Sequence, residues 1–207
     1  MVDRVQNVTR LMEIDIEGWR VAAIGAETTI CAAALEALRA NGGIELNEEI
    51  SPTEADILLV SWNLVPERSD GAEADALVAA AGKAAEAMSR RGKGAVIFLL
   101  TAAAAIPIRR HAEHSRLMSA AAAAMRCISM ESAPHVRVNA LGFGCIGESA
   151  SDSGDISMLT HVPLARTGKL DEAVDAVLFM ADPLNSYTTG QLLPVDGGWS
   201  AGYARSF

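Results

Sequence analysis

Gly-Ala-Val-Ile-Phe-Leu-Leu, at residues 94–100, is an unbroken apolar run with the length of a β-strand. A strand that is apolar on both faces is typical of a parallel sheet that helices cover on both sides. Long helical stretches are expected before and after this run, at Ala72–Arg90 and Ala112–Met130. The run therefore predicts a central strand of a layered α/β fold.

Apolar runs and helical stretches alternate in the same way over the rest of the chain. The further elements that we expect are strands at Val21–Ile24, Asp56–Ser61, Val136–Leu141 and Gln191–Val195, and helices at Thr29–Asn41 (stopped by Gly42 and Gly43) and Leu170–Ala181. No repeat or low-complexity linker divides the chain. This order predicts one α/β domain over residues 1–207, with a Rossmann-like, doubly wound parallel sheet.

The segment Ile44–Ala55 departs from this alternation. It leaves only twelve residues between the first expected helix and the strand that begins at Asp56. A parallel crossover with its own helix takes about a dozen residues before its flanking strands are counted. We therefore expect the second crossover to be shortened and to lack its helix.

The composition excludes some classes of function. The chain has 207 residues, of which 50% are hydrophobic and 21% charged, and its formal net charge is −9. An acidic chain of this kind lacks the basic surface that neutralises the phosphates of nucleic acids. No leader-like segment opens the sequence, and no apolar run is long enough to span a bilayer. We therefore predict a cytoplasmic protein without a nucleic-acid or membrane partner.

The three cysteines, Cys31, Cys127 and Cys145, are few and odd in number. Each lies in an apolar context, and their spacing matches no metal-binding motif. We therefore expect small, buried thiols in a reducing compartment, not a disulfide framework.

Several motifs follow one another at consistent spacing in the last third of the chain. They are Val-Arg-Val-Asn-Ala at 136–140, Pro-Leu-Ala-Arg-Thr-Gly at 163–168 with Asp-Glu at 171–172, Ser-Tyr-Thr-Thr-Gly-Gln at 186–191 and Val-Asp-Gly-Gly at 195–198. On these motifs the chain resembles the short-chain dehydrogenases, and weaker similarity extends over most of the chain. The resemblance implies a Rossmann-like fold, a dinucleotide cofactor and a Tyr-x-x-x-Lys catalytic pair.

The cofactor-binding turn departs from that family. Of the three glycines in the family's Gly-x-x-x-Gly-x-Gly turn, Gly25 keeps the first, whereas Thr29 and Cys31 replace the other two. These glycines let the backbone approach a pyrophosphate at the N-terminus of a helix. Glu27 adds a negative charge where the diphosphate would lie, and Glu148 takes the position of the family's nicotinamide-side threonine.

Two further departures concern the surroundings of the cofactor. The strand that would carry the ribose-binding acid falls within the shortened segment Ile44–Ala55, and Trp62 places a large ring in a passage that the family keeps open with small residues.

The catalytic positions of the family are also changed. In the register set by the motifs, the serine position is Thr101, the tyrosine position is His114 and the lysine position is Met118. The first 186 residues contain no tyrosine. Met118 has neither the charge nor the hydrogen-bond donor through which the family's lysine lowers the pKa of its tyrosine. The resemblance therefore implies a member without a cofactor site or catalytic group of its own.

Two other interpretations of this region remain open. His114 is a candidate acid or base together with Thr101, because imidazole titrates near neutrality, but a redox reaction also needs a hydride acceptor. His111, Glu113 and His114 suggest a metal site, although only the two histidines have the spacing of one helix face and no third ligand is evident. A solvated helix face is the simpler expectation, and we predict no metal.

The alanine-rich helices at 72–90 and 112–130 occupy the places where the resembling family forms its subunit interface. We therefore expect an oligomer, and the hypothesis is a non-catalytic subunit of a heteromeric, NAD-dependent short-chain dehydrogenase. Its partner would be a homologous active subunit that holds the NAD, in a heterotetramer that oxidises a secondary alcohol, with a CoA thioester among the candidate substrates. The tail Gly202–Phe207 would reach across the interface. The alternative is a self-associating regulatory protein that senses a small ligand.

Overall fold

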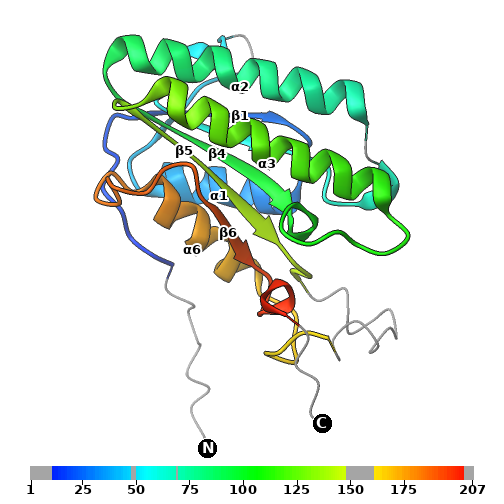
Figure 1. Ribbon diagram of the computed structural model, residues 1–207. Coiled ribbons are helices and arrows are strands. Elements are labelled where there is room, and N and C mark those ends of the chain that lie inside the picture. Colours follow the sequence, from blue (N-terminus) through cyan, green and yellow to red (C-terminus); the bar gives the residue numbers. More distant parts are fainter. Residues whose placement is uncertain (1–10, 48–49, 69, 148–160, 203–207) are drawn as a thin grey trace, which may run out of the picture.

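Six parallel strands form a single sheet in the order β2-β1-β3-β4-β5-β6 (Figure 1). The computed structural model describes residues 11–47, 50–68, 70–147 and 161–202. The strands are β1 (Arg20–Gly25), β2 (Ile44–Glu45), β3 (Ile57–Ser61), β4 (Gly94–Thr101), β5 (Val136–Phe143) and β6 (Leu192–Val195). After β1 the chain first adds β2 on one side and then β3 on the other. This confirms the doubly wound parallel sheet.

Helices cover both faces of the sheet. The helices α2 (Gly71–Arg91) and α3 (Ala112–Ser132) lie on one face, and α1 (Thr29–Ala40) and α6 (Leu170–Ala181) lie on the other (Figure 1). Each expected helix is present, with ends that differ from the expected ones by no more than two residues. The layers are therefore helix, sheet and helix, as the apolar run at 94–100 predicts.

The crossover from β2 to β3 is short. Its described residues hold one 3-10 turn, Pro52–Glu54, and no α-helix. The two-residue strand β2 was not expected. It pairs with the start of β1, where Arg20 lies opposite Ile44.

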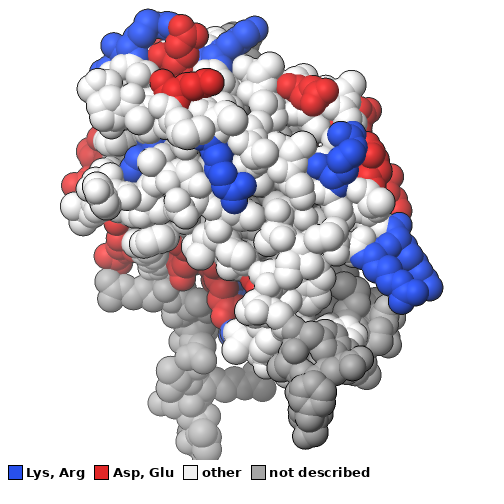
Figure 2. All heavy atoms as spheres, viewed as in Figure 1, with Lys and Arg blue, Asp and Glu red and all other residues white. Residues whose placement is uncertain are grey.

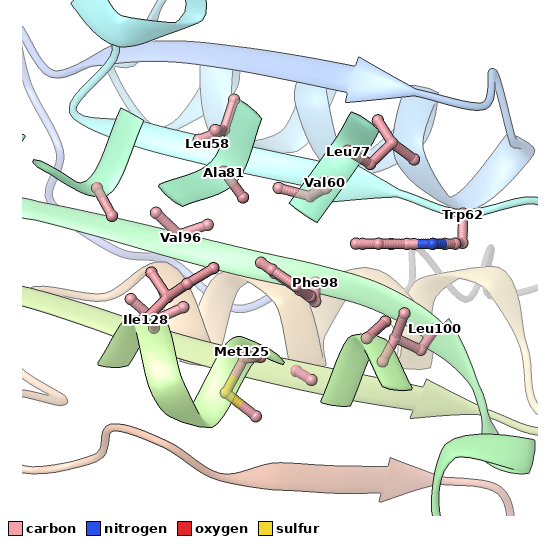
Figure 3. Close-up of a cluster of buried hydrophobic side chains, with 14 of the residues drawn as sticks. Leu58, Val60, Trp62, Leu77, Ala81, Val96, Phe98, Leu100, Met125 and Ile128 are labelled. Carbon is pink, nitrogen blue, oxygen red and sulfur yellow. The ribbon is translucent and has the colours of Figure 1, made fainter. Parts of the chain in front are cut away.

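The two central strands β3 and β4 carry the core on both faces. Leu58, Val96 and Phe98 point towards α2 and α3, together with the other side chains drawn in Figure 3. Leu59 and Ile97 point the other way, towards α1 and α6. Leu58, Val96, Phe98, Leu59 and Ile97 are almost completely buried, and each contributes ~2 kcal/mol through the removal of apolar surface from water.

The strand β6 closes one end of the sheet. The N–H of Ala140 donates to the carbonyl of Gln191, and the N–H of Gly144 donates to the carbonyl of Val195. Because backbone groups alternate in direction along a strand, Pro194 lies where a backbone N–H would point outward from the edge. That side chain is exposed.

A buried carboxylate joins the amino-terminal ends of β1, β3 and β4. The guanidinium of Arg20 donates to both oxygens of Asp56, at 3.2 and 3.0 Å. The cationic groups of Arg91 and Lys93 each lie 3.7 Å from the same carboxylate. Burial alone raises the pKa of Asp56, but the hydrogen bonds from Arg20 and the charges of Lys93 and Arg20 together outweigh it, so that the pKa lies below its ordinary value.

The three cysteines differ in their burial. Cys31 is buried and Cys145 half-buried, but Cys127 is exposed, because it lies on the outward face of α3. The expectation of three buried thiols is therefore wrong for Cys127.

Within the described part of the chain, no helix combines the length and apolar character that a membrane span requires.

Replacing Asp56 by alanine should lower the free energy of unfolding by about 3 kcal/mol, because three cations then lose their buried partner. Glu54→Ala is the matched control, since Glu54 pairs with the same Arg20 from an exposed position and should cost less than about 1 kcal/mol. Urea unfolding at neutral pH measures both losses. Equal losses would contradict the central role of Asp56.

The same carboxylate should make stability depend on acid. Because the pKa of Asp56 is lowered in the folded state, its stabilisation is complete above the unfolded-state pKa of about 3.9 and is lost as the pH falls through the lower folded-state pKa. The difference in unfolding free energy between the wild type and Asp56→Ala should therefore shrink below about pH 4. A difference that stays constant down to acid pH would argue against this origin.

Candidate functional site

The carboxyl ends of β1 and β3 lie where the strand order reverses. In open α/β sheets this is the usual place for a ligand, because the chain leaves neighbouring strands in opposite directions. Gly25 at the end of β1 is paired with Ser61 at the end of β3. The predicted cofactor turn therefore lies at the switch point of the sheet.

Gly25 is required there by the backbone. Its φ is +94°, and a Cβ atom at this position would lie 2.2 Å from the carbonyl oxygen of Ser61. The next residue, Ala26, donates its N–H to that same carbonyl at 2.8 Å. The local backbone therefore requires glycine at position 25, whether or not a ligand binds there.

The N-terminus of α1 is capped by the chain's own side chain. The hydroxyl of Thr28 accepts from the N–H of Cys31 at 3.1 Å and lies 3.3 Å from the hydroxyl of Ser61. Burial raises the pKa of the Cys31 thiol, while a hydrogen bond with Ser61 acts in the opposite direction. Glu27 and Thr29 are exposed beside this turn. The two residues that replace family glycines thus lie apart, Thr29 outside and Cys31 inside.

A cleft of about 440 Å³ lies next to this turn. Its walls come from β1, the start of α1 and the segment after β2, and include Gly25, Glu27, Cys31, Glu45 and Asn47. Glu45, at the end of β2, pairs with Arg39 at 3.3 Å. Glu45 was not expected at this site, because the two exposed residues of β2 give no pattern from which the strand could be predicted.

The structure brings together the two polar groups expected at the catalytic positions. The hydroxyl of Thr101, at the end of β4, lies 2.8 Å from Nε2 of His114 on α3. His114 is only 1% exposed and Thr101 8% exposed. The expectation of a solvated face is therefore wrong for His114, because that residue shares the inward face of α3 with Leu117 and Met118.

Apolar side chains occupy the neighbouring space. Met118 is buried in the cluster between the sheet and α3, one helical turn after His114. The ring of Trp62 is also buried and packs against Phe98 with a centroid distance of 4.9 Å (Figure 3). The hollow that both Trp62 and Met118 border holds about 10 Å³, which is room for about one water molecule.

The pKa of His114 is lowered. Burial is the main cause, the neighbouring His111 adds to it, and Glu67 acts against it. The ring is thus favoured in its neutral form, in which one nitrogen accepts and the other donates. His111 itself lies 3.9 Å from the carboxylate of Glu67, across the loop that follows β3.

Glu148 and residues 203–207 of the tail lie outside the described residues. Within the described ranges, no three His, Cys, Asp or Glu side chains gather in a way that could hold a metal ion. The site that can be described thus consists of the cleft beside Gly25 and the buried pair of Thr101 and His114.

Comparison with protein families and curated proteins points to one superfamily of oxidoreductases. The family model described as enoyl-(acyl carrier protein) reductase matches residues 68–200. The L-xylulose reductase of Caenorhabditis elegans is 32% identical over 121 residues, which cover 55% of this chain and 48% of that protein. A 3-oxoacyl-[acyl-carrier-protein] reductase of Chlamydia trachomatis is 41% identical over 68 residues, 31% of this chain and 27% of that protein. In both matches the aligned part spans half or less of the relative's length.

Solved structures resemble the fold over nearly the whole chain. The ligand-free aldohexose dehydrogenase of Thermoplasma acidophilum has a TM-score of 0.73 at 18% identity, over 92% of this chain and 97% of that one. A short-chain oxidoreductase of Pseudomonas aeruginosa, described as containing an atypical catalytic center, has a TM-score of 0.70 at 17% identity, over 89% and 98% of the two chains. At such identities the likeness shows the fold.

The buried His114 should make the protein less stable in mild acid. Below the ordinary pKa of 6.5, the unfolded chain binds a proton that the folded chain binds only at lower pH, so the unfolding free energy falls as the pH drops below about 6.5. His114→Gln should remove this part of the pH dependence, because an amide can still bond to Thr101 but does not titrate. Denaturant unfolding between about pH 5 and 8 measures the slope.

The control for this experiment is His135→Gln, which changes an exposed histidine. It should leave the slope of the wild type unchanged. If His114→Gln also keeps the slope of the wild type, the pH dependence does not originate at His114.

Proposed function

The chain belongs to the short-chain dehydrogenase/reductase family of oxidoreductases, and from this premise we propose that it is a non-catalytic subunit of a heteromeric, NAD-dependent dehydrogenase. In this proposal a homologous active subunit binds the NAD and oxidises a secondary alcohol. This chain supplies an interface and shapes the pocket of its partner in a heterotetramer.

The proposal rests mainly on the side chains that fill the region around the catalytic positions. Thr101 and His114 bond to each other in the interior, and Met118 is part of the apolar core. A neutral, buried imidazole next to a thioether offers no cation that would stabilise an ionised acid–base group. These groups hold helix α3 against the sheet and are poorly suited to exchange protons with a substrate.

The cofactor turn supports the same proposal. A diphosphate would need free N–H groups at the N-terminus of α1, and the hydroxyl of Thr28 already occupies one of them, the N–H of Cys31. Glu27 would repel a diphosphate at close range. The residues at this turn therefore do not fit a dinucleotide, and the proposal places the NAD in the partner subunit.

An outward face of small side chains gives the proposed interface its position. The exposed residues along α2 and α3 include Ala72, Ala76, Ala79, Ser119, Ala120, Ala123 and Cys127. Figure 2, in the view that places α2 and α3 in front, shows a face that is mostly white, with separate Lys or Arg side chains across its middle. Small residues let two helical layers approach closely, and Met130, which is 72% exposed, provides apolar surface at one end.

The narrowest form of the proposal identifies both the enzyme and its substrate. In this form the chain is the cofactor-free subunit of the 2-(α-hydroxyphenylmethyl)succinyl-CoA dehydrogenase of anaerobic toluene degradation. That subunit resembles this chain in lacking the same motifs. The support is that likeness alone, and no residue described above selects a CoA thioester. Oxidation of this thioester with NAD by the purified complex would test it.

A second candidate is a pseudoenzyme that senses a ligand and associates with itself. The cleft of about 440 Å³ beside Gly25 favours it, since that volume lies in the range of small-molecule sites. In this alternative, Thr101 and His114 are structural as well, and no partner dehydrogenase is needed.

Co-expression with a dehydrogenase encoded beside this chain separates the two candidates. Native mass spectrometry should give a mixed oligomer, and calorimetric titration with NAD should show binding to the partner and none to this chain alone. A homo-oligomer that binds NAD by itself would refute the subunit proposal, and it would restore Thr101 and His114 as catalytic candidates. A homo-oligomer that does not bind NAD and takes no partner would favour the sensor.

Ala123→Arg should disrupt the assembly, because a long charged side chain is then placed in the middle of the proposed helical interface. The measured mass should move towards the 21.7 kDa of the single chain, with unchanged circular dichroism. Ala40→Arg is the matched control: this alanine is also exposed, but it ends α1 on the opposite side of the sheet. Equal masses for the two variants would locate the interface elsewhere.

A further inference from the structure

Residues 11–17, which precede β1, lie in an extended form across α1 and α6. Their side chains alternate: Met12 and Ile14 are half-buried and Ile16 is completely buried, whereas residues 13, 15 and 17 are exposed. The inward side chains pack against the apolar cluster between α1, α6 and the sheet. Figure 1 shows this segment in dark blue on the side of the molecule that carries α6. We call residues 11–17 the strap.

Two side chains hold the backbone of the strap. The N–H of Met12 donates to a carboxylate oxygen of Asp175 on α6 at 2.7 Å. The N–H of Ile14 donates to the side-chain oxygen of Asn41, at the end of α1, also at 2.7 Å. Helix α6 and the end of α1 thus each bind one of two alternate N–H groups of the strap, in the way that a peptide-binding groove holds an extended ligand.

The end of α1 leaves room for the strap. Gly42 has a φ of +91°, and a Cβ atom there would lie 3.0 Å from the Cα of Glu17 and 2.5 Å from its carboxylate. The N–H of Gly18 also donates to the carbonyl of Gly42 at 3.1 Å. The glycine that ends the helix therefore also allows the strap to pass close to it.

Helix α6 is fixed at both of its ends as well. At its N-terminus, Arg166 donates to both carboxylate oxygens of Glu172, at 2.7 and 2.6 Å, and Gly168 pairs with Ile146, which follows β5. At its C-terminus, the half-buried guanidinium of Arg137 donates to the carbonyls of Met180 and its neighbours. Asp175 lies between these ends, so the strap holds the middle of the helix.

We propose that the strap is bound by α1 and α6 as a peptide ligand in cis, and that it sets the position of α6 and of the loop 161–169 before it. Binding of the strap and order in α6 are then coupled: a change that releases one loosens the other. This proposal is independent of whether the chain is catalytic.

Hydrogen exchange resolved to single amides tests the coupling in the full chain. Asp175→Ala should raise the exchange of the Met12 amide about tenfold or more, which corresponds to about 1.4 kcal/mol, and it should also raise exchange in α6 and in the loop 161–169. Asp175→Asn keeps an acceptor oxygen and should stay near the wild type. Asp171→Ala removes a carboxylate from the same helix outside the strap contact, and it should leave the Met12 amide unchanged.

A second variant approaches the same bond from the other side. Met12→Pro deletes the N–H donor together with the inward Met12 side chain, without altering α6, and it should raise exchange in α6 at least as much as Asp175→Ala. Once Met12→Pro is present, Asp175→Ala should add little, because the N–H from which Asp175 accepts is already absent. Unchanged exchange in the strap after Asp175→Ala, or faster exchange confined to the strap in either variant, would overturn the proposal.

Discussion

The shared carboxylate of Asp56 sets the frame of this molecule. It lies 3% exposed at the start of β3, where the cations of β1, the end of α2 and the start of β4 converge on it. A buried charge with several partners is tolerated only in one geometry, so these amino-terminal ends have a fixed register. The pairing of Gly25 with Ser61, at the carboxyl ends of β1 and β3, belongs to the same register.

The sequence predicts the elements whose burial is strong and regular. Each residue of β4 is buried, and for that reason its apolar run stands out. The strand β2 could not be predicted, because two exposed residues have no pattern and pair only through β1. The strap was missed for a related reason: its alternation is short, and its partners are a carboxylate and an amide far away in the chain.

The residues that form the candidate site were predicted from the sequence, but their burial was not. Thr101 and His114 were expected at neighbouring positions, and they do form a hydrogen bond. That His114 is buried could not be derived from its polarity. It depends on the phase of α3, which the small residues around it leave poorly defined. The motifs that carry the family resemblance are easier to place, because they hold backbone: Asn139 bonds to the carbonyl of Thr188 and the N–H of Gln191, and Asp196 accepts from the N–H groups that follow it.

The outward position of Pro194 has a consequence for growth of the sheet. An incoming strand needs a row of free donors, and here β6 is four residues long with one donor replaced by a ring. The opposite edge, β2, has only two residues. Neither margin can template a continuous ladder, so the protein is protected against fibre-like, strand-by-strand polymerisation. In the proposed assembly, contacts would therefore fall to the helical layers, where the shapes of side chains can close the particle at a finite size.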